Sequence, residues 1–235
     1  MIRINRILPL GSSGVKIPIR KIRNEYFEKL NEKGRRKINR ILENAIASRS
    51  LFNSGITQIQ VDLMQYLVNN YKNILIGDVN ILEKTKREIE NNGWQGLVFE
   101  NNRISPFGKK LLTAFGYTNR FRSDQNRGIW LAKQLNIKSC PYCNAQYTLT
   151  IQSKDKDSLA KFQFDHFFSK ERYPYFSVSL YNLIPSCASC NHKKSNKIFS
   201  LERNYHPYYN SIAAFSKFKL EYPSSLEKLS FDCLK

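Results

Sequence analysis

An aspartate followed directly by a histidine, Asp165-His166, is the pair of side chains in this sequence whose types best suit chemistry. A histidine titrates near neutral pH and can take a proton from water. A carboxylate is a good ligand for a hard cation such as Mg²⁺ or Mn²⁺. Such a pair suits phosphodiester hydrolysis, which needs an activated water and a cation that neutralises the charge developing on the phosphate. Because adjacent side chains of a strand point to opposite faces, we expect the pair at a strand end, a bend or a bulge.

Four of the five cysteines form two C-x-x-C pairs, one on each side of this histidine in the sequence. Their members are Cys140, Cys143, Cys187 and Cys190, and 44 residues separate Cys143 from Cys187. Two such pairs can place four thiolates around one Zn²⁺ ion in a closed tetrahedral site, the pattern of structural zinc. Buried free cysteines or a redox pair would not account for both pairs, so we predict a structural zinc site. Cys233 has no partner in the sequence and is predicted to be a bystander.

The region from about residue 138 to about residue 200 resembles the HNH, or ββα-metal, endonuclease family. The resemblance rests on three segments that occur in the family's order. They are Phe164-Asp165-His166-Phe167, Tyr181-Asn182-Leu183-Ile184-Pro185 and Cys187-Ala188-Ser189-Cys190-Asn191-His192-Lys193-Lys194. The resemblance implies an enzyme that hydrolyses phosphodiester bonds with a single Mg²⁺ or Mn²⁺ ion, which stabilises the leaving 3′ oxygen.

The same resemblance assigns roles by position. Asp165 corresponds to the cation ligand, His166 to the general base, and Asn182 to the residue that braces the loop and orients the base. Asn191 corresponds to the second cation ligand, with His192 as its rival. We favour Asn191 because it follows Asn182 by nine residues and stands at the head of the final predicted helix.

The positive charge of the chain favours a nucleic-acid partner. The net charge is +19 and the pI is about 9.8, and Lys and Arg side chains release counterions when they contact phosphates. The resemblance favours DNA over RNA. The alternative is that surplus lysine only keeps the protein soluble. The residues expected to contact nucleic acid near the site are Lys193, Lys194, Lys197 and Arg172, although a solvated helix face is an equal alternative for each lysine.

Within the HNH family, the chain looks like bacterial nuclease subunits of anti-phage defence systems, of the Septu type or associated with retrons. The similar residues are Asp165 to Phe168, Lys170 to Tyr175 and Leu180 to Asn191. That resemblance implies an ATPase partner protein, since the sequence has no Walker-type phosphate loop of its own. Residues 1–50 carry 13 basic and 4 acidic side chains, whereas residues 51–100 carry 4 basic and 6 acidic ones. The helical region that contains both stretches is the expected docking and substrate-guiding module.

The elements that must position the site predict an α+β protein. Residues 1–135 form the basic N-terminal region, which reads as irregular over 1–20 and as helices over 22–48, 56–75, 79–91, 106–116 and 127–136. Residues 136–202 form the zinc-stapled nuclease core, with strands predicted over 147–151 and 162–168 and a helix over 188–197. Residues 203–235 are predicted to be a C-terminal extension packed on the core, with a turn and a satisfied histidine at His206 and a strand over 218–222.

Two other functions fit part of the sequence. A stand-alone homing or restriction HNH nuclease would need its own base-reading element, and the sequence shows neither a helix-turn-helix nor a base-reading zinc finger. A zinc-stabilised nucleic-acid-binding module without catalysis would fit the charge and the cysteines but leaves Asp165, His166 and Asn191 unexplained. With no apolar run of roughly 18–20 residues and no secretion signal, we expect a cytoplasmic protein with no membrane partner.

Overall fold

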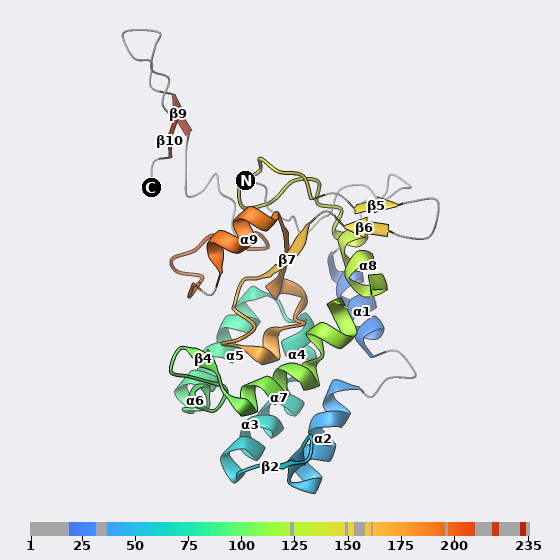
Figure 1. Cartoon of the computed structure of the whole chain (residues 1–235), viewed down its shortest axis with the longest axis vertical. Coiled ribbons are helices and arrows are strands. Elements are labelled where there is room, and N and C mark those ends of the chain that lie inside the picture. The colour runs from blue at the N-terminus through green and yellow to red at the C-terminus, as the bar shows by residue number, and fades with distance from the viewer. Residues whose placement is uncertain are drawn as a thin grey trace.

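The protein is an α+β assembly in which helices form most of the molecule and the strands pair two by two. The structure, a computed structural model, describes residues 19–31, 37–122, 125–148, 150–152, 158–160, 162–195, 197–209, 218–220 and 231–233. Helices α2 and α3 lie at one end of the molecule, and α9 and strand β7 lie towards the other end (Figure 1). None of the helices in these ranges combines the length and the apolar character that a membrane span requires. The irregular segment predicted at 1–20 falls almost entirely outside the described residues.

The N-terminal helices begin and end where local chemistry predicts. Helix α5 starts after Asp78, whose Oδ1 accepts hydrogen bonds from the backbone N–H groups of Asn80 and Ile81, both at 3.1 Å. Helix α7 begins with a proline and ends at Gly116, whose φ of 75° is left-handed. The helices are α1 Ile19–Leu30, α2 Ile38–Ser48, α3 Gln58–Asn69, α4 Tyr71–Ile76, α5 Val79–Asn91, α6 Gln95–Val98, α7 Pro106–Phe115, the π-helix η1 Tyr117–Arg122 and α8 Gln125–Leu135. The segment predicted as one helix over 22–48 contains two helices, α1 and α2.

Two short hairpins interrupt the helices, and the sequence analysis missed them. Strands β1 Ser50–Leu51 and β2 Ser54–Gly55 pair antiparallel, as do β3 Phe99–Glu100 and β4 Arg103–Ile104. Both two-residue tips have positive φ, 50° and 60° at Phe52-Asn53 and 49° and 57° at Asn101-Asn102. Tight hairpins favour asparagine at such positions. The adjacent asparagines Asn101 and Asn102 could therefore have predicted the second hairpin.

A strand–loop–strand–helix unit carries the predicted site. Strand β7 Gln163–His166 pairs antiparallel with β8 Leu183–Ser186, with His166 opposite Leu183. The loop between them contains the 3₁₀ helices η2 Pro174–Phe176 and η3 Leu180–Asn182. Helix α9 Ala188–Lys194 follows directly and ends before Ser195, whose φ is 46°. It is therefore shorter than the predicted 188–197. The remaining strands are β5 Thr150–Gln152, β6 Ser158–Ala160, β9 Phe218–Leu220 and β10 Phe231–Cys233.

One hydrophobic core joins the N-terminal helices to this unit. The buried cluster contains residues of α1 to α8 together with Phe167, Phe176 and Leu183. The Tyr26 hydroxyl donates to the Val178 carbonyl at 2.8 Å, and the Ser179 hydroxyl donates to the Ile74 carbonyl at 2.5 Å. The boundary predicted at residue 136 is therefore crossed by shared packing, and the helices support the loop between β7 and β8.

The segment after α9 packs on the core through residues 206–208. His206 is buried against Phe167, with ring centroids 4.2 Å apart, and its Nδ1 accepts the Tyr208 N–H at 3.2 Å. The Tyr208 hydroxyl donates to the Leu183 carbonyl of β8 at 3.1 Å. The predicted turn is present, and the Nδ1 atom of its histidine has a hydrogen-bond partner.

We predict that His206 makes the stability of the protein depend on pH. Burial lowers the pKa of His206 to about 3, well below the value of about 6.5 for an exposed histidine. Between these pH values His206 takes up a proton in the unfolded chain but stays unprotonated in the folded chain. The free energy of unfolding therefore falls as the pH falls through this window, by about 1.4 kcal/mol per pH unit from this group.

Replacing His206 with asparagine tests this expectation. Asparagine keeps an acceptor for the Tyr208 N–H but takes up no proton. Urea unfolding at several pH values from 7 down to 5 measures the free energy of unfolding. For the variant this free energy should depend on pH less steeply than for the wild type, by the equivalent of about one proton. Parallel pH profiles for the wild type and the variant would contradict it.

Candidate active site and metal centre

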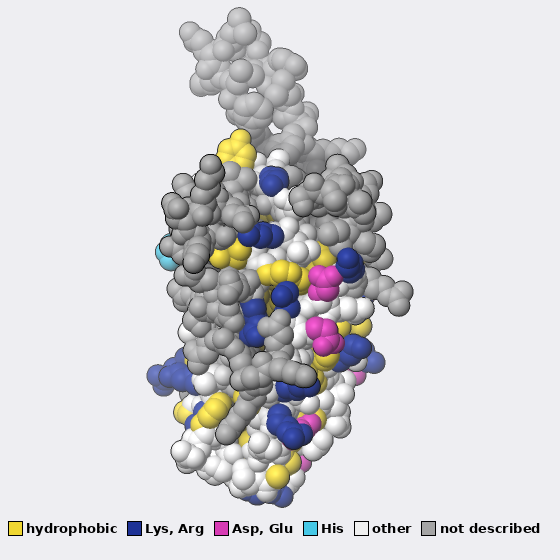
Figure 2. All heavy atoms as spheres, turned by 90° about the vertical axis from the view of Figure 1, so that its right-hand side faces the viewer, with side chains coloured by type: hydrophobic (Ala, Val, Ile, Leu, Met, Phe, Trp, Pro, Cys, Tyr) yellow, Lys and Arg dark blue, Asp and Glu magenta, His cyan; other side chains and the backbone are white. Residues whose placement is uncertain are grey.

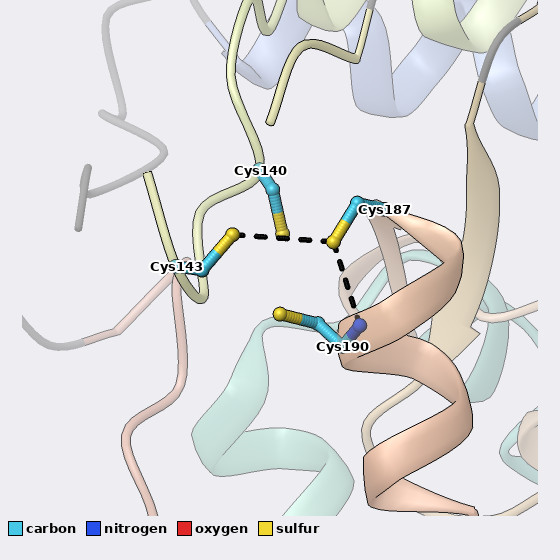
Figure 3. Close-up of side chains that lie close together, drawn as sticks. All are labelled: Cys140, Cys143, Cys187 and Cys190. Atoms are coloured by element: carbon cyan, nitrogen blue, oxygen red, sulfur yellow. Dashed lines mark hydrogen bonds between the residues drawn. The ribbon is translucent and has the colours of Figure 1, made fainter. Parts of the chain in front are cut away.

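The four predicted cysteines converge on one point. Their sulfur atoms all lie within 4.8 Å of one another, and the Cys143 and Cys187 sulfurs are 3.9 Å apart. A tetrahedral zinc ion with Zn–S bonds of about 2.3 Å would need sulfurs about 3.8 Å apart. Figure 3 shows one pair entering from the loop after α8 and the other from the start of α9. The cluster could therefore hold a metal ion such as zinc.

Local turns aim each pair at this point. The Cys140 N–H donates to the Gln146 carbonyl and the Asn144 N–H donates to the Cys140 carbonyl, both at 2.8 Å, which folds the first pair into a tight loop. Cys187 is the N-cap of α9, and its sulfur accepts the Cys190 N–H at 3.4 Å. The contact directs the Cys187 sulfur towards the start of α9.

The cysteines of the cluster influence one another's ionisation. Burial, followed by the neighbouring thiols, raises the pKa of Cys190 well above its ordinary value. Cys143 is exposed, and hydrogen bonds from the Ala145 and Gln146 backbone outweigh its burial and lower its pKa to about 7. Four thiolates packed this closely would repel one another without a positive ion between them.

His166 lies at the end of β7 with its ring held by a backbone carbonyl. Its Nε2 is 2.9 Å from the Ser177 carbonyl oxygen. A carbonyl only accepts hydrogen bonds, so Nε2 carries the proton and Nδ1 keeps its lone pair. The Tyr117 ring packs edge-on at a centroid distance of 4.5 Å. Burial, helped by the positive charge of Lys170, lowers the pKa of His166 to about 3, so the imidazole is neutral at neutral pH.

Asn182 holds the loop that orients this histidine. Its side-chain oxygen accepts the Phe168 N–H at 2.7 Å, and its nitrogen donates to the carbonyls of Phe168 and Phe176, both at 3.0 Å. Phe176 precedes Ser177, whose carbonyl meets the His166 ring. The fully buried Asn182 therefore fixes both ends of the path from β7 to that carbonyl.

Asp165 and His166 make separate sets of contacts. The Asp165 carboxylate accepts the Tyr142 hydroxyl at 2.6 Å and the Lys194 ammonium at 3.0 Å, whereas the His166 ring meets Ser177 and Tyr117. Pairing with β8 continues in register through both residues, Asp165 opposite Ile184. The expected strand end is present, but the structure has no bulge at this pair.

Asn191 contacts the same strand as Asp165 from α9. Its Nδ2 donates to the Gln163 side chain at 2.6 Å, and Gln163 lies two residues before Asp165 on β7, on the same face. The Asn191 side-chain oxygen is the atom suited to a cation. His192, its rival, is exposed on the next position of α9.

The oxygen donors of Asp165 and Asn191 suit a hard cation, but the carboxylate already has a positive partner. The Lys194 ammonium contacts one oxygen of the Asp165 carboxylate. The side chains of Lys194 and Asp165 are only 5% and 4% exposed, respectively. A divalent ion at Asp165 would have to share this carboxylate with Lys194 or displace it.

Two of the residues predicted to contact nucleic acid are placed otherwise. Lys194 is 6% exposed and pairs with Asp165, because the short α9 turns this side chain towards β7. The Arg172 guanidinium lies over the Phe99 ring, 4.9 Å from its centroid, and is half-buried. Lys193 and Lys197 are exposed, as a phosphate contact requires.

Tyr142 is a site residue that the sequence analysis missed. It lies between Cys140 and Cys143, so the only available signal was its place inside the C-x-x-C pair. Its hydroxyl contact with Asp165 links residues 23 positions apart, and no periodicity in the sequence reports such a contact.

Comparisons of the chain with protein families, with curated proteins and with solved structures yield no match. The assignment of a function therefore rests on the motif and on the geometry described above.

Proposed function

We propose that this protein is a metal-dependent endonuclease of the HNH type. The observation that carries the proposal is the position of His166, whose ring the Ser177 carbonyl holds at the end of β7 within a strand–loop–strand–helix unit. The zinc-type cysteine cluster that joins the start of α9 to the loop after α8 supports the same reading.

In this mechanism His166 is the general base. Its Nδ1 takes a proton from water, and the hydrogen bond from Nε2–H to the Ser177 carbonyl stabilises the positive charge that the ring acquires. Asn182 keeps that carbonyl in place through its contact with Phe176. A divalent cation held by Asp165 and Asn191 would supply the positive charge that stabilises the leaving oxygen.

The cysteine cluster has a structural role in this proposal. Zinc bound by four thiolates has no open position for substrate or water. The ion would hold the start of α9 against the loop after α8 and so keep Asn191 beside β7.

The substrate that fits best is nucleic acid, with DNA favoured by the resemblance. Lys and Arg side chains are spread over the face drawn in Figure 2, where Asp and Glu side chains are fewer. Lys193 in α9 and Lys197 just after it are also exposed. The defence-system role beside an ATPase partner rests on the resemblance of the sequence to such nuclease subunits.

A second candidate is a nucleic-acid-binding module without catalysis. The buried pair of Asp165 and Lys194 favours it, since the carboxylate is already neutralised. The two candidates differ in whether they break a covalent bond.

Nicking of supercoiled plasmid DNA tests the proposal. The purified wild type is expected to nick or linearise the plasmid with Mg²⁺ or Mn²⁺, and to stop when EDTA removes the cation. A parallel assay on labelled single-stranded RNA decides between the two nucleic acids. Binding of both polymers with cutting of neither, with a candidate ATPase supplied, would favour the binding module.

A further inference from the structure

A polar contact runs from the first cysteine pair directly to the candidate carboxylate. Tyr142 lies between two of the clustered cysteines, and its hydroxyl donates to Asp165 Oδ2 at 2.6 Å. Asp165 is 3% exposed. A phenol keeps its proton at neutral pH, so the Tyr142 hydroxyl is the donor in this contact.

The second cysteine pair reaches the same carboxylate by another route. Helix α9 starts after Cys187 and ends at Lys194, whose ammonium donates to Asp165 Oδ1 at 3.0 Å and also to the His166 carbonyl. Each pair of cysteines is thus connected through the backbone to one hydrogen-bond donor, Tyr142 or Lys194. Both donors contact the Asp165 carboxylate. A metal ion that draws the pairs together would also draw the two donors together.

We propose that Tyr142 is a positioning residue that couples metal occupancy of the four-cysteine site to the placement of the Asp165 carboxylate. The inference rests on the proposed function only in treating Asp165 as part of a hydrolytic site. The coupling itself is a property of the metal centre.

The physical basis is the cost of leaving a buried charge without its partners. When one partner of a buried charged group is removed, the charge stays in an environment that cannot solvate it, and this costs free energy. The carboxylate therefore favours the arrangement in which the loop of Cys140 to Cys143 brings the Tyr142 hydroxyl within reach. Coupling of this kind is reciprocal, so a hydrogen bond that depends on the metal must also tighten metal binding.

The test measures zinc affinity, by competition with a chromogenic chelator, in Tyr142→Phe, Asp165→Asn and the double variant. Tyr142→Phe removes only the hydroxyl and is expected to weaken zinc binding by about tenfold, as does Asp165→Asn. In the double variant the loss should be smaller than the sum of the two single losses, because both single variants act on the same contact. Tyr147→Phe is the matched control: Tyr147 lies four residues beyond Cys143 with its side chain 75% exposed, and its variant should bind zinc like the wild type.

A second measurement separates positioning from general stability. At saturating zinc, Tyr142→Phe should retain one zinc per chain and the wild-type KM for DNA but have a lower kcat. Zinc affinities of Tyr142→Phe and Tyr147→Phe that match the wild type would overturn the proposal, as would fully additive losses in the double variant. If Asp165→Asn does not fold, the comparison of the two tyrosine variants decides alone.

The zinc measurements stand apart from the proposed function. If the variants show coupled zinc affinities but the wild type cuts neither DNA nor RNA, the role of Tyr142 is supported and the nuclease proposal is rejected. If the wild type cuts nucleic acid and Tyr142→Phe keeps both its zinc affinity and its kcat, the nuclease proposal is supported and the role of Tyr142 is rejected.

Discussion

Replacing His166 with alanine is expected to lower the rate of DNA cleavage by about 10²–10⁴-fold, the usual contribution of a general base. The wild-type ring is neutral and has one nitrogen committed to the Ser177 carbonyl, which leaves Nδ1 to take the proton. Alanine offers no such atom. The rate is best measured in single-turnover cleavage of labelled DNA with Mg²⁺ or Mn²⁺, where binding and product release do not limit it.

Binding and folding provide the controls for this variant. Gel-shift affinity for DNA should be unchanged, because the phosphate contacts that we propose come from exposed lysines such as Lys193 and Lys197. Thermal melting checks the fold, since His166 is buried. Cleavage by His166→Ala at the wild-type rate would show that the base lies elsewhere. In the same assay, a larger loss from His192→Ala than from Asn191→Ala would reassign the second cation ligand.

Replacing Cys187 with serine is expected to release the structural metal and to destabilise the region around α9. Apparent zinc-binding energies in small zinc domains are about 10–16 kcal/mol. If about 5 kcal/mol of that stabilises this larger protein, the melting temperature should fall by about 10–20 °C. Cys187 is also the N-cap of α9, so its loss removes the Cys190 N–H contact as well.

Metal content and melting temperature measure this effect, under reducing conditions and with a strong chelator as a second route. The wild type should carry one zinc ion per chain. Cys233→Ser is the matched control, because Cys233 does not belong to the cluster of Cys140, Cys143, Cys187 and Cys190 found in the described residues. A Cys187→Ser variant that melts with the wild type, with or without chelator, would rule out a structural metal.

The sequence alone was sufficient for several, though not all, of the features that depend on near neighbours. Helices α5 and α7 lie where the periodicity placed them, because capping by Asp78 and Ser105 and the left-handed Gly116 act within one turn. The two C-x-x-C pairs were recognisable because a metal site needs its ligands at fixed local spacing. The fold brings the two pairs together across 44 positions of the sequence.

Tertiary structure alone decided what the charged groups of the candidate site meet. Lys193 and Lys194 are neighbours of the same type, yet one is exposed and the other is buried on Asp165, because the angle of α9 against β7 selects which side chain points inward. The Tyr142 hydroxyl and the Ser177 carbonyl reach Asp165 and His166 in the same way, across 23 and 11 residues. Residue types and local spacing thus determined which groups are available for chemistry. Packing of distant segments determined their partners, because burial makes every charge depend on whatever the fold brings beside it.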